Sequence, residues 1–105
     1  MADTLFDVSD TIVLVSGGSR GIGYAIAQGF AERDAKVIIT GREESTLKKA
    51  CAAHSGGAHP MTYEVCDQAD TDAITACVAS VISKHGHIDT LVNCAGVNKR
   101  MPALE

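Results

Sequence analysis

The sequence predicts an α/β domain built on a doubly wound parallel sheet. Short β-branched apolar runs alternate with segments of helical spacing, and a cluster of glycines follows the first run. Continuous apolar runs are typical of strands buried on both faces of a parallel sheet, and such strands are joined by right-handed helical crossovers. We therefore expect the order β-α-β-α-β-α-β, with ligands bound beyond the carboxyl ends of the strands.

Four strands account for the apolar runs. They are expected at residues 11–16, 36–40, 58–65 and 88–93. The third is the least regular, because Pro60 has to lie near its beginning.

Each of the three helices expected between these strands carries an apolar stripe. The third stripe is the most regular, since Asp70 or Thr71 can cap its beginning and Gly86 follows its end. From the first helix to the third, the stripes are Ile22, Ala25, Ile26, Gly29 and Phe30, then Leu47, Ala50, Cys51 and His54, then Ile74, Cys77, Val78, Val81 and Ile82.

The composition favours a single folded domain. The chain has 105 residues, of which 46% are hydrophobic, and it carries charges of both signs. A net charge of −4 argues against a nucleic-acid partner. No apolar run approaches the ~20 residues of a membrane span, and the acidic first ten residues do not resemble a secretory signal.

The four cysteines are widely spaced and form no C-x-x-C pair. We expect them to be reduced, mostly buried thiols in a cytoplasmic protein. His85 and His87 resemble a metal-binding H-x-H pair only superficially, so no metal site is expected.

A glycine-rich turn joins the first strand to the first helix. Gly17, Gly21 and Gly23 have the spacing G-x-x-x-G-x-G, with Ser19 and Arg20 between them. A pyrophosphate needs backbone N–H groups at close range, which side chains at the contact points would hold off. The helix N-terminus adds unpaired N–H donors and the positive end of its dipole. The sequence therefore predicts a dinucleotide site at this turn.

The turn resembles the T-G-x-x-x-G-x-G segment of the short-chain dehydrogenase/reductase family, with Ser16 in place of the usual Thr. Two further segments match at the right distances. Residues 92–96 resemble the family's N-N-A-G segment, with Cys94 replacing the second Asn. Cys66 and Asp67 resemble the acidic position after the third strand. Together the three motifs cover nearly the whole chain and imply a Rossmann-like fold.

The resemblance also implies individual roles for these residues. Ile22 would offer its backbone N–H to the pyrophosphate, and Asp67 would accept a hydrogen bond from the adenine amino group. Asn93, Ala95 and Gly96 would line the ribose. For Asp67 a plain turn-forming role is the alternative.

The residue after the second strand predicts which cofactor is bound. NAD-binding sheets of this type carry an Asp or Glu there, whereas this chain has Gly41 followed by Arg42. Arg42 can make a two-pronged contact with a 2′-phosphate, and Arg20 can approach the same group from the other side. We therefore expect NADP(H) to be preferred over NAD(H). The alternative for Arg42 is an ion pair with Glu43 or Glu44.

Catalytic residues of the family are missing. Its members carry a Ser and a Tyr followed four residues later by Lys, whereas Tyr24 and Tyr63 are followed at that distance by Gln28 and Asp67. We expect residues 1–105 to be the truncated, dinucleotide-binding N-terminal half of an NAD(P)-dependent oxidoreductase. That enzyme would act on a carbonyl or alcohol, and this chain alone would be inactive. The alternative is a complete binding or interaction module without catalysis.

The end of the chain gives thin clues to substrate and assembly. Residues 98–105 resemble the tail of the family's sugar-acid and polyol members, of the gluconate 5-dehydrogenase kind. Lys99 and Arg100 would attract a carboxylated substrate or be solvated loop charges. The fourth strand would leave an exposed apolar edge, so we expect self-association or a homo-oligomer.

Overall fold

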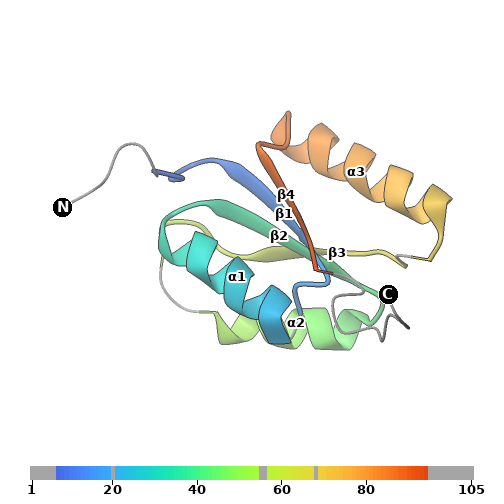
Figure 1. Cartoon of the computed structure of the whole chain (residues 1–105), viewed down its shortest axis with the longest axis horizontal. Coiled ribbons are helices and arrows are strands. Elements are labelled where there is room, and N and C mark those ends of the chain that lie inside the picture. The colour runs from blue at the N-terminus through green and yellow to red at the C-terminus, as the bar shows by residue number, and fades with distance from the viewer. Residues whose placement is uncertain (1–6, 20, 55–56, 68, 95–105) are drawn as a thin grey trace, which may run out of the picture.

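The computed structural model describes residues 7–19, 21–54, 57–67 and 69–94. Within these ranges no helix has both the length and the apolarity needed to cross a membrane. Strands and helices alternate along them, as Figure 1 shows, in the order β1 (Ile12–Ser16), α1 (Gly21–Glu32), β2 (Lys36–Gly41), α2 (Glu44–Ala53), β3 (Thr62–Val65), α3 (Thr71–His85) and β4 (Thr90–Asn93).

The described strands form one parallel sheet in the order β3-β2-β1-β4. The first two crossovers move in one direction and the third returns past β1, so the strand order reverses between β1 and β4. The register sets Ser16 of β1 opposite both Thr40 of β2 and Asn93 of β4. The predicted doubly wound α/β fold is confirmed. Its strand order reverses at these three residues, which is the place where folds of this kind generally bind their ligands.

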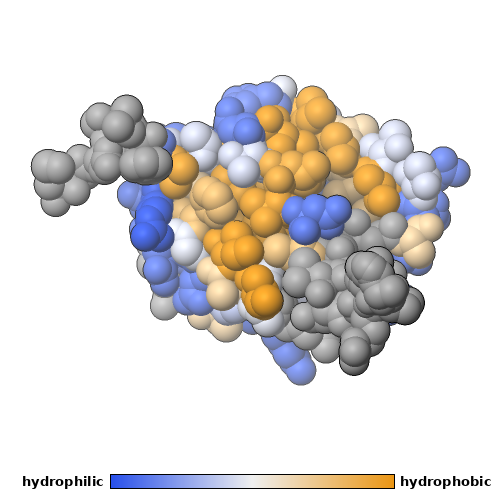
Figure 2. Space-filling view, in the orientation of Figure 1, coloured by the Kyte–Doolittle hydropathy of each residue, from blue (hydrophilic) through white to orange (hydrophobic). Residues whose placement is uncertain are grey.

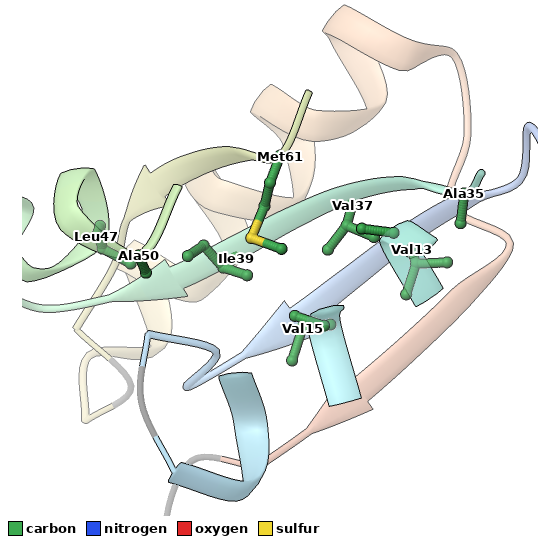
Figure 3. Close-up of a cluster of buried hydrophobic side chains, with 10 residues drawn as sticks. Val13, Val15, Ala35, Val37, Ile39, Leu47, Ala50 and Met61 are labelled. Carbon is green, nitrogen blue, oxygen red and sulfur yellow. The ribbon is translucent and has the colours of Figure 1, made fainter. Parts of the chain in front are cut away.

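Helices cover both faces of the sheet (Figure 1): α1 and α2 lie on one face and α3 on the other. Successive residues of a strand point to opposite faces, so β1 and β2 divide their side chains between two cores. Figure 3 shows the first core, in which Val13, Val15, Val37 and Ile39 meet α1 and α2. The second core, on the α3 side, contains Ile12, Leu14, Ile38 and Val81.

Two strands, β3 and β4, begin at least two residues later than predicted. The segment before β3 makes loop hydrogen bonds instead, because the Ala58 N–H donates to Asp34 Oδ1 (2.8 Å) and Pro60 has no N–H to give. Before β4, the Asp89 carboxylate accepts from the Ile12 N–H (2.7 Å) and so replaces a ladder bond.

The prediction for the buried face of α1 was wrong. The α1 residues buried against the sheet are the small ones, Gly23, Ala27 and Ala31. Ile22 is 56% exposed and Phe30 is only partly buried. The helix lies so close to the glycine turn that residues without bulk must face the sheet. The larger side chains of the predicted stripe therefore lie beside this contact rather than in it.

The predicted ends of α3 are confirmed. Asp70 is the N-cap, and its Oδ1 accepts from the N–H groups of Asp72 (2.9 Å) and Ala73 (3.2 Å). Gly86, with φ of 91°, is the C-cap and donates its N–H to Ile82 O (2.7 Å).

Candidate functional site

The glycine turn is fastened to the end of β2. The N–H groups of Gly17 and Gly18 both donate to the Thr40 carbonyl, at 3.0 and 3.3 Å. A Cβ on Gly18 would come within 2.6 Å of Ile39 Cγ2, so the turn lies directly on the β2 side chains. These contacts fix the turn beyond the carboxyl ends of the central strands.

The other strand ends are tied to the same place. The Cys66 N–H donates to Gly41 O (2.7 Å), which holds the residue after β3 against the end of β2. The Cys94 N–H donates to Ser16 O (2.9 Å), which holds the residue after β4 against β1. Segments far apart in sequence therefore converge at one edge of the sheet.

Three glycines of the turn are needed for two different reasons. Gly17 and Gly21 have φ of 77° and 62°, in the left-handed region that side chains disfavour. At Gly23 the constraint is space, because a Cβ there would lie 2.1 Å from Gly17 O. The first turn of α1 can therefore lie close to the backbone of Gly17. The N–H groups of that first turn have no acceptor within the helix, which makes this end a favourable place for an anion.

A cavity of about 130 Å³ lies beneath this edge, on the α3 side of the sheet. Two buried hydroxyls open into it, Ser16 Oγ and Thr40 Oγ1, and neither has a hydrogen-bond partner within the described ranges. Orphaned buried hydroxyls are uncommon and call for a partner. The full lining is Leu14, Ser16, Thr40, Cys66, Ile74, Cys77, Val78, Leu91 and Asn93.

Arg42 lies immediately after β2 and is exposed. None of the ion pairs among the described residues includes it, so the alternative pairing with a neighbouring glutamate is not seen. Glu44 instead accepts the Tyr63 hydroxyl (2.8 Å), and this hydrogen bond raises the pKa of Tyr63. Ser19 Oγ lies 3.7 Å from where a Cβ on Gly41 would be. The glycine turn and the segment carrying Arg42 are thus neighbours.

Asp67 is exposed and shapes its own turn. Its Oδ1 accepts from the Ala69 N–H (2.9 Å) and its carbonyl accepts from the Asp70 N–H (3.0 Å). The turn-forming role offered as the alternative is therefore present. A carboxylate has two oxygens with several acceptor positions, so this role leaves capacity for a ligand.

Asn93 ends β4, is exposed and lines the cavity. The remaining predicted contacts, Arg20, Ala95 and Gly96, lie outside the described residues, as do Lys99 and Arg100. In the part of the chain that the structure describes, no group of three or more His, Cys, Asp or Glu side chains is arranged to hold a metal.

Residues 11–105 match the family described as short chain dehydrogenase. The chain belongs to this family. The match includes the glycine turn and every strand end described above, so fold and family agree.

Individual relatives support the same assignment. Gluconate 5-dehydrogenase of Gluconobacter oxydans is 37% identical over 101 residues, which is 96% of this chain and 40% of that protein. The crystal structure of 2-keto-3-deoxy-D-gluconate dehydrogenase from Streptococcus agalactiae has a TM-score of 0.80 at 34% identity, covering 95% of this chain and 38% of that one. A metagenomic short-chain oxidoreductase in complex with NADP has a TM-score of 0.72 at 33% identity, covering 81% and 38%. This short-chain dehydrogenase chain thus spans about 40% of the length of each of these three relatives.

The family's nicotinamide cofactor fits the residues present. The helix end at Gly21 can hold a pyrophosphate, because Gly21 has no side chain and the space beside it is open, with no atom within 4 Å of where its Cβ would be. The cavity and its two orphaned hydroxyls were missed by sequence reasoning. Their only signal is that Ser16 and Thr40 place a hydroxyl near the carboxyl end of two otherwise apolar strands.

Proposed function

We propose that this chain is the NADP(H)-binding part of a short-chain oxidoreductase, which transfers hydride between the nicotinamide and a carbonyl or alcohol. One observation carries the proposal: the α1 N-terminus meets a turn whose Gly23–Gly17 contact leaves no room even for a methyl group. Such closeness serves a ligand that must reach backbone N–H groups, as a pyrophosphate does.

Under this proposal each strand end serves one part of the cofactor. The turn from Gly17 to Gly23, with the Ile22 N–H, binds the pyrophosphate. Asp67 accepts from the adenine amino group after β3. Asn93, with Ala95 and Gly96, lines the ribose after β4.

NADP(H) is the preferred cofactor in this proposal because Arg42 is exposed beside the turn and forms no ion pair among the described residues. Its guanidinium would bind the 2′-phosphate, with Arg20 on the other side. A charge-assisted hydrogen bond contributes roughly 1.5–3 kcal/mol, so one arginine supplies about a 10- to 150-fold preference.

The test is to measure Kd for NADPH and for NADH with Arg42→Asp. We expect the preference for NADPH to fall by at least about tenfold. Arg33→Asp is the matched control, because it changes the charge equally at the opposite end of α1, where Arg33 contacts the Gly29 carbonyl. An unchanged ratio of the Kd values for NADPH and NADH in Arg42→Asp would contradict the assignment of Arg42 to the 2′-phosphate.

We propose further that the isolated chain binds the cofactor without turning it over. The family's Tyr-x-x-x-Lys pair does not occur in its sequence, and the chain spans about 40% of its relatives. A sugar acid is the proposed substrate of the whole enzyme, since the gluconate 5-dehydrogenase relative is named for one and Lys99 and Arg100 would attract its carboxylate. NADPH oxidation by the 105-residue chain above background, with any carbonyl compound, would contradict the proposal.

The surface around β4 supports the view that more protein packs here. Leu91 is 61% exposed and Ile82 of α3 is 43% exposed. Figure 2 shows hydrophobic residues gathered around β4 and reaching α3. We propose that this surface contacts the remainder of the enzyme, or a second copy when the chain is alone. A gene that continues past Glu105 into Tyr-x-x-x-Lys supports the enzyme, whereas an immediate stop favours the binding module.

The proposed compartment is the cytoplasm. All four cysteines are thiols rather than disulfides, as a reducing environment requires. Localising a tagged full-length protein by microscopy would test this directly.

A further inference from the structure

Two cysteines from different elements meet in the cavity beneath the site. Cys66 is the first residue after β3, and Cys77 lies in the second turn of α3. Both line the cavity of about 130 Å³, and they are only 3% and 7% exposed. A water molecule occupies about 30 Å³ in the liquid, so the cavity has room for a small oxidant beside the two sulfurs.

The two thiols lie close enough for Cys66 to act on the pKa of Cys77, and neither is engaged in a disulfide. Burial, and next the charge and hydrogen bond of Cys66, raise the pKa of Cys77 to about 11. Glu64 acts in the same direction, and Lys84 opposes it. Cys77 therefore holds its proton at neutral pH, and we assign it the second step, in which it displaces the oxygen of the sulfenic acid.

The other two cysteines provide an internal comparison. Cys51 and Cys94 pack against the core on the α1 and α2 side of the sheet. Cys77 belongs to α3, on the opposite side. The sheet thus separates Cys51 and Cys94 from the Cys77 thiol. In the folded chain, the disulfide between Cys66 and Cys77 should therefore form in preference to the other possible disulfides.

We propose that Cys66 and Cys77 form a reversible disulfide site, closed by a small hydroperoxide such as hydrogen peroxide and reopened by a dithiol. The Cys66 sulfur attacks one peroxide oxygen, the O–O bond breaks, and a sulfenic acid forms at Cys66 as hydroxide leaves. The Cys77 sulfur then displaces the sulfenic oxygen as water, forming the S–S bond. Two thiols lose two electrons in total and one hydrogen peroxide becomes two waters.

The disulfide would close residues 66–77 into a loop, and this loop would transmit its effect to the cofactor site. Residues 66–77 contain Asp67 and the α3 N-cap Asp70, and the Cys66 N–H holds the end of β2 through Gly41 O. Drawing the Cys66 sulfur to bonding distance of about 2 Å from Cys77 shifts Asp67 with it. This consequence rests on the proposed adenine contact of Asp67. We expect NADPH to bind up to about tenfold more weakly to the oxidised chain, the equivalent of one charge-assisted hydrogen bond.

The direct test is to oxidise the full folded chain with hydrogen peroxide, alkylate the remaining thiols and map the cross-link by mass spectrometry. Trypsin alone is insufficient, because no Lys or Arg lies between Lys49 and Lys84. Cleavage at aspartates separates the partners, since Asp67, Asp70 and Asp72 lie between them. We expect a loss of about 2 Da, a Cys66–Cys77 cross-link and reversal by dithiothreitol.

Matched variants make the outcome decisive. A double variant with Cys51→Ala and Cys94→Ala should keep the cross-link, whereas Cys77→Ala should lose it and leave Cys66 to oxidise further. When the wild-type chain is oxidised in urea, where it is unfolded, disulfides should form between several different pairs of cysteines. Cross-links at other pairs in the folded chain, or sulfinic acid at Cys66 with no cross-link, would overturn the proposal.

NADPH titrations of the reduced and cross-linked chains separate the two ideas. Equal affinity in both forms overturns the coupling to Asp67. If NADPH binds neither form, both the proposed function and the coupling are contradicted. The mapped cross-link still tests whether the disulfide forms.

Discussion

Replacing Gly23 by alanine should destabilise the chain, although alanine is normally the better helix residue. A Cβ at position 23 would lie 2.1 Å from Gly17 O and 3.2 Å from Gly18 Cα, both backbone atoms that cannot rotate away. Gly29, in the same helix, is the matched control. A Cβ there meets only Arg33 Nη1 at 3.8 Å, the far end of a flexible side chain.

The two substitutions should therefore have opposite signs. Gly29→Ala gains helix propensity of about 0.8–1 kcal/mol and meets no steric cost. Gly23→Ala forces the turn and helix about 1 Å apart, and overpacking of this kind costs about 1–3 kcal/mol, occasionally more. The free energies of unfolding of the two variants should differ by roughly 2–4 kcal/mol.

Urea denaturation followed by circular dichroism measures this difference. With a slope of about 1 kcal/mol/M, the midpoint should fall by about 1–3 M in Gly23→Ala and rise by about 1 M in Gly29→Ala. NADPH affinity supplies a second measurement, because only Gly23→Ala displaces the proposed pyrophosphate turn. Equal midpoints for the two variants would refute the packing argument at Gly23.

Three further changes test other parts of the structure. Asp70→Ala removes the α3 N-cap and should lower the free energy of unfolding by about 1 kcal/mol in the same urea assay, and no change would contradict the cap. The hydrogen bond from the Ile12 N–H, and secondarily His87, holds the pKa of Asp89 below its usual value. Its stabilisation is therefore present above the unfolded pKa of about 3.9 and is lost as pH falls through the folded pKa. Asp89→Asn should be less stable than wild type at pH 7, and the difference should close as pH falls through the folded pKa of Asp89; a constant difference would exclude the charge as the cause. Leu91→Lys should reduce self-association in sedimentation experiments, whereas undiminished association would place the contact elsewhere.

The periodicity of the sequence predicted most of the fold because strand and helix signals here are local. Asp70 and Gly86 set the ends of α3 with their own caps, which sequence alone identifies. The face of α1 was predicted wrongly for a non-local reason. Its burial is decided by the distance of Gly23 from Gly17 O across a turn, and an apolar stripe carries no information about that distance.

The sequence predicted the glycine turn of the candidate site but not the cavity beneath it. Spacing placed Gly17, Gly21 and Gly23 in one turn, and the conformations and contacts of all three fit that prediction. The cavity was not predictable, because its lining comes from β1, β2, β4 and α3 and no motif joins them. The roles of Arg42 and the other predicted cofactor contacts stay predictions until a cofactor is titrated.

The reversal of strand order explains why so short a chain can assemble these parts. Had the third crossover continued past β3, the end of β4 would lie three strands away from the glycine turn. Because it returns past β1, Asn93 pairs with Ser16, and the Cys94 N–H reaches the Ser16 carbonyl. The same return places α3 as the single helix on its face of the sheet within the described ranges, which brings Cys77 near Cys66 and leaves Leu91 exposed. One topological step therefore creates the cofactor edge, the thiol pair beneath it and the apolar surface beside it, so a substitution that perturbs the docking of α3 should alter all three together.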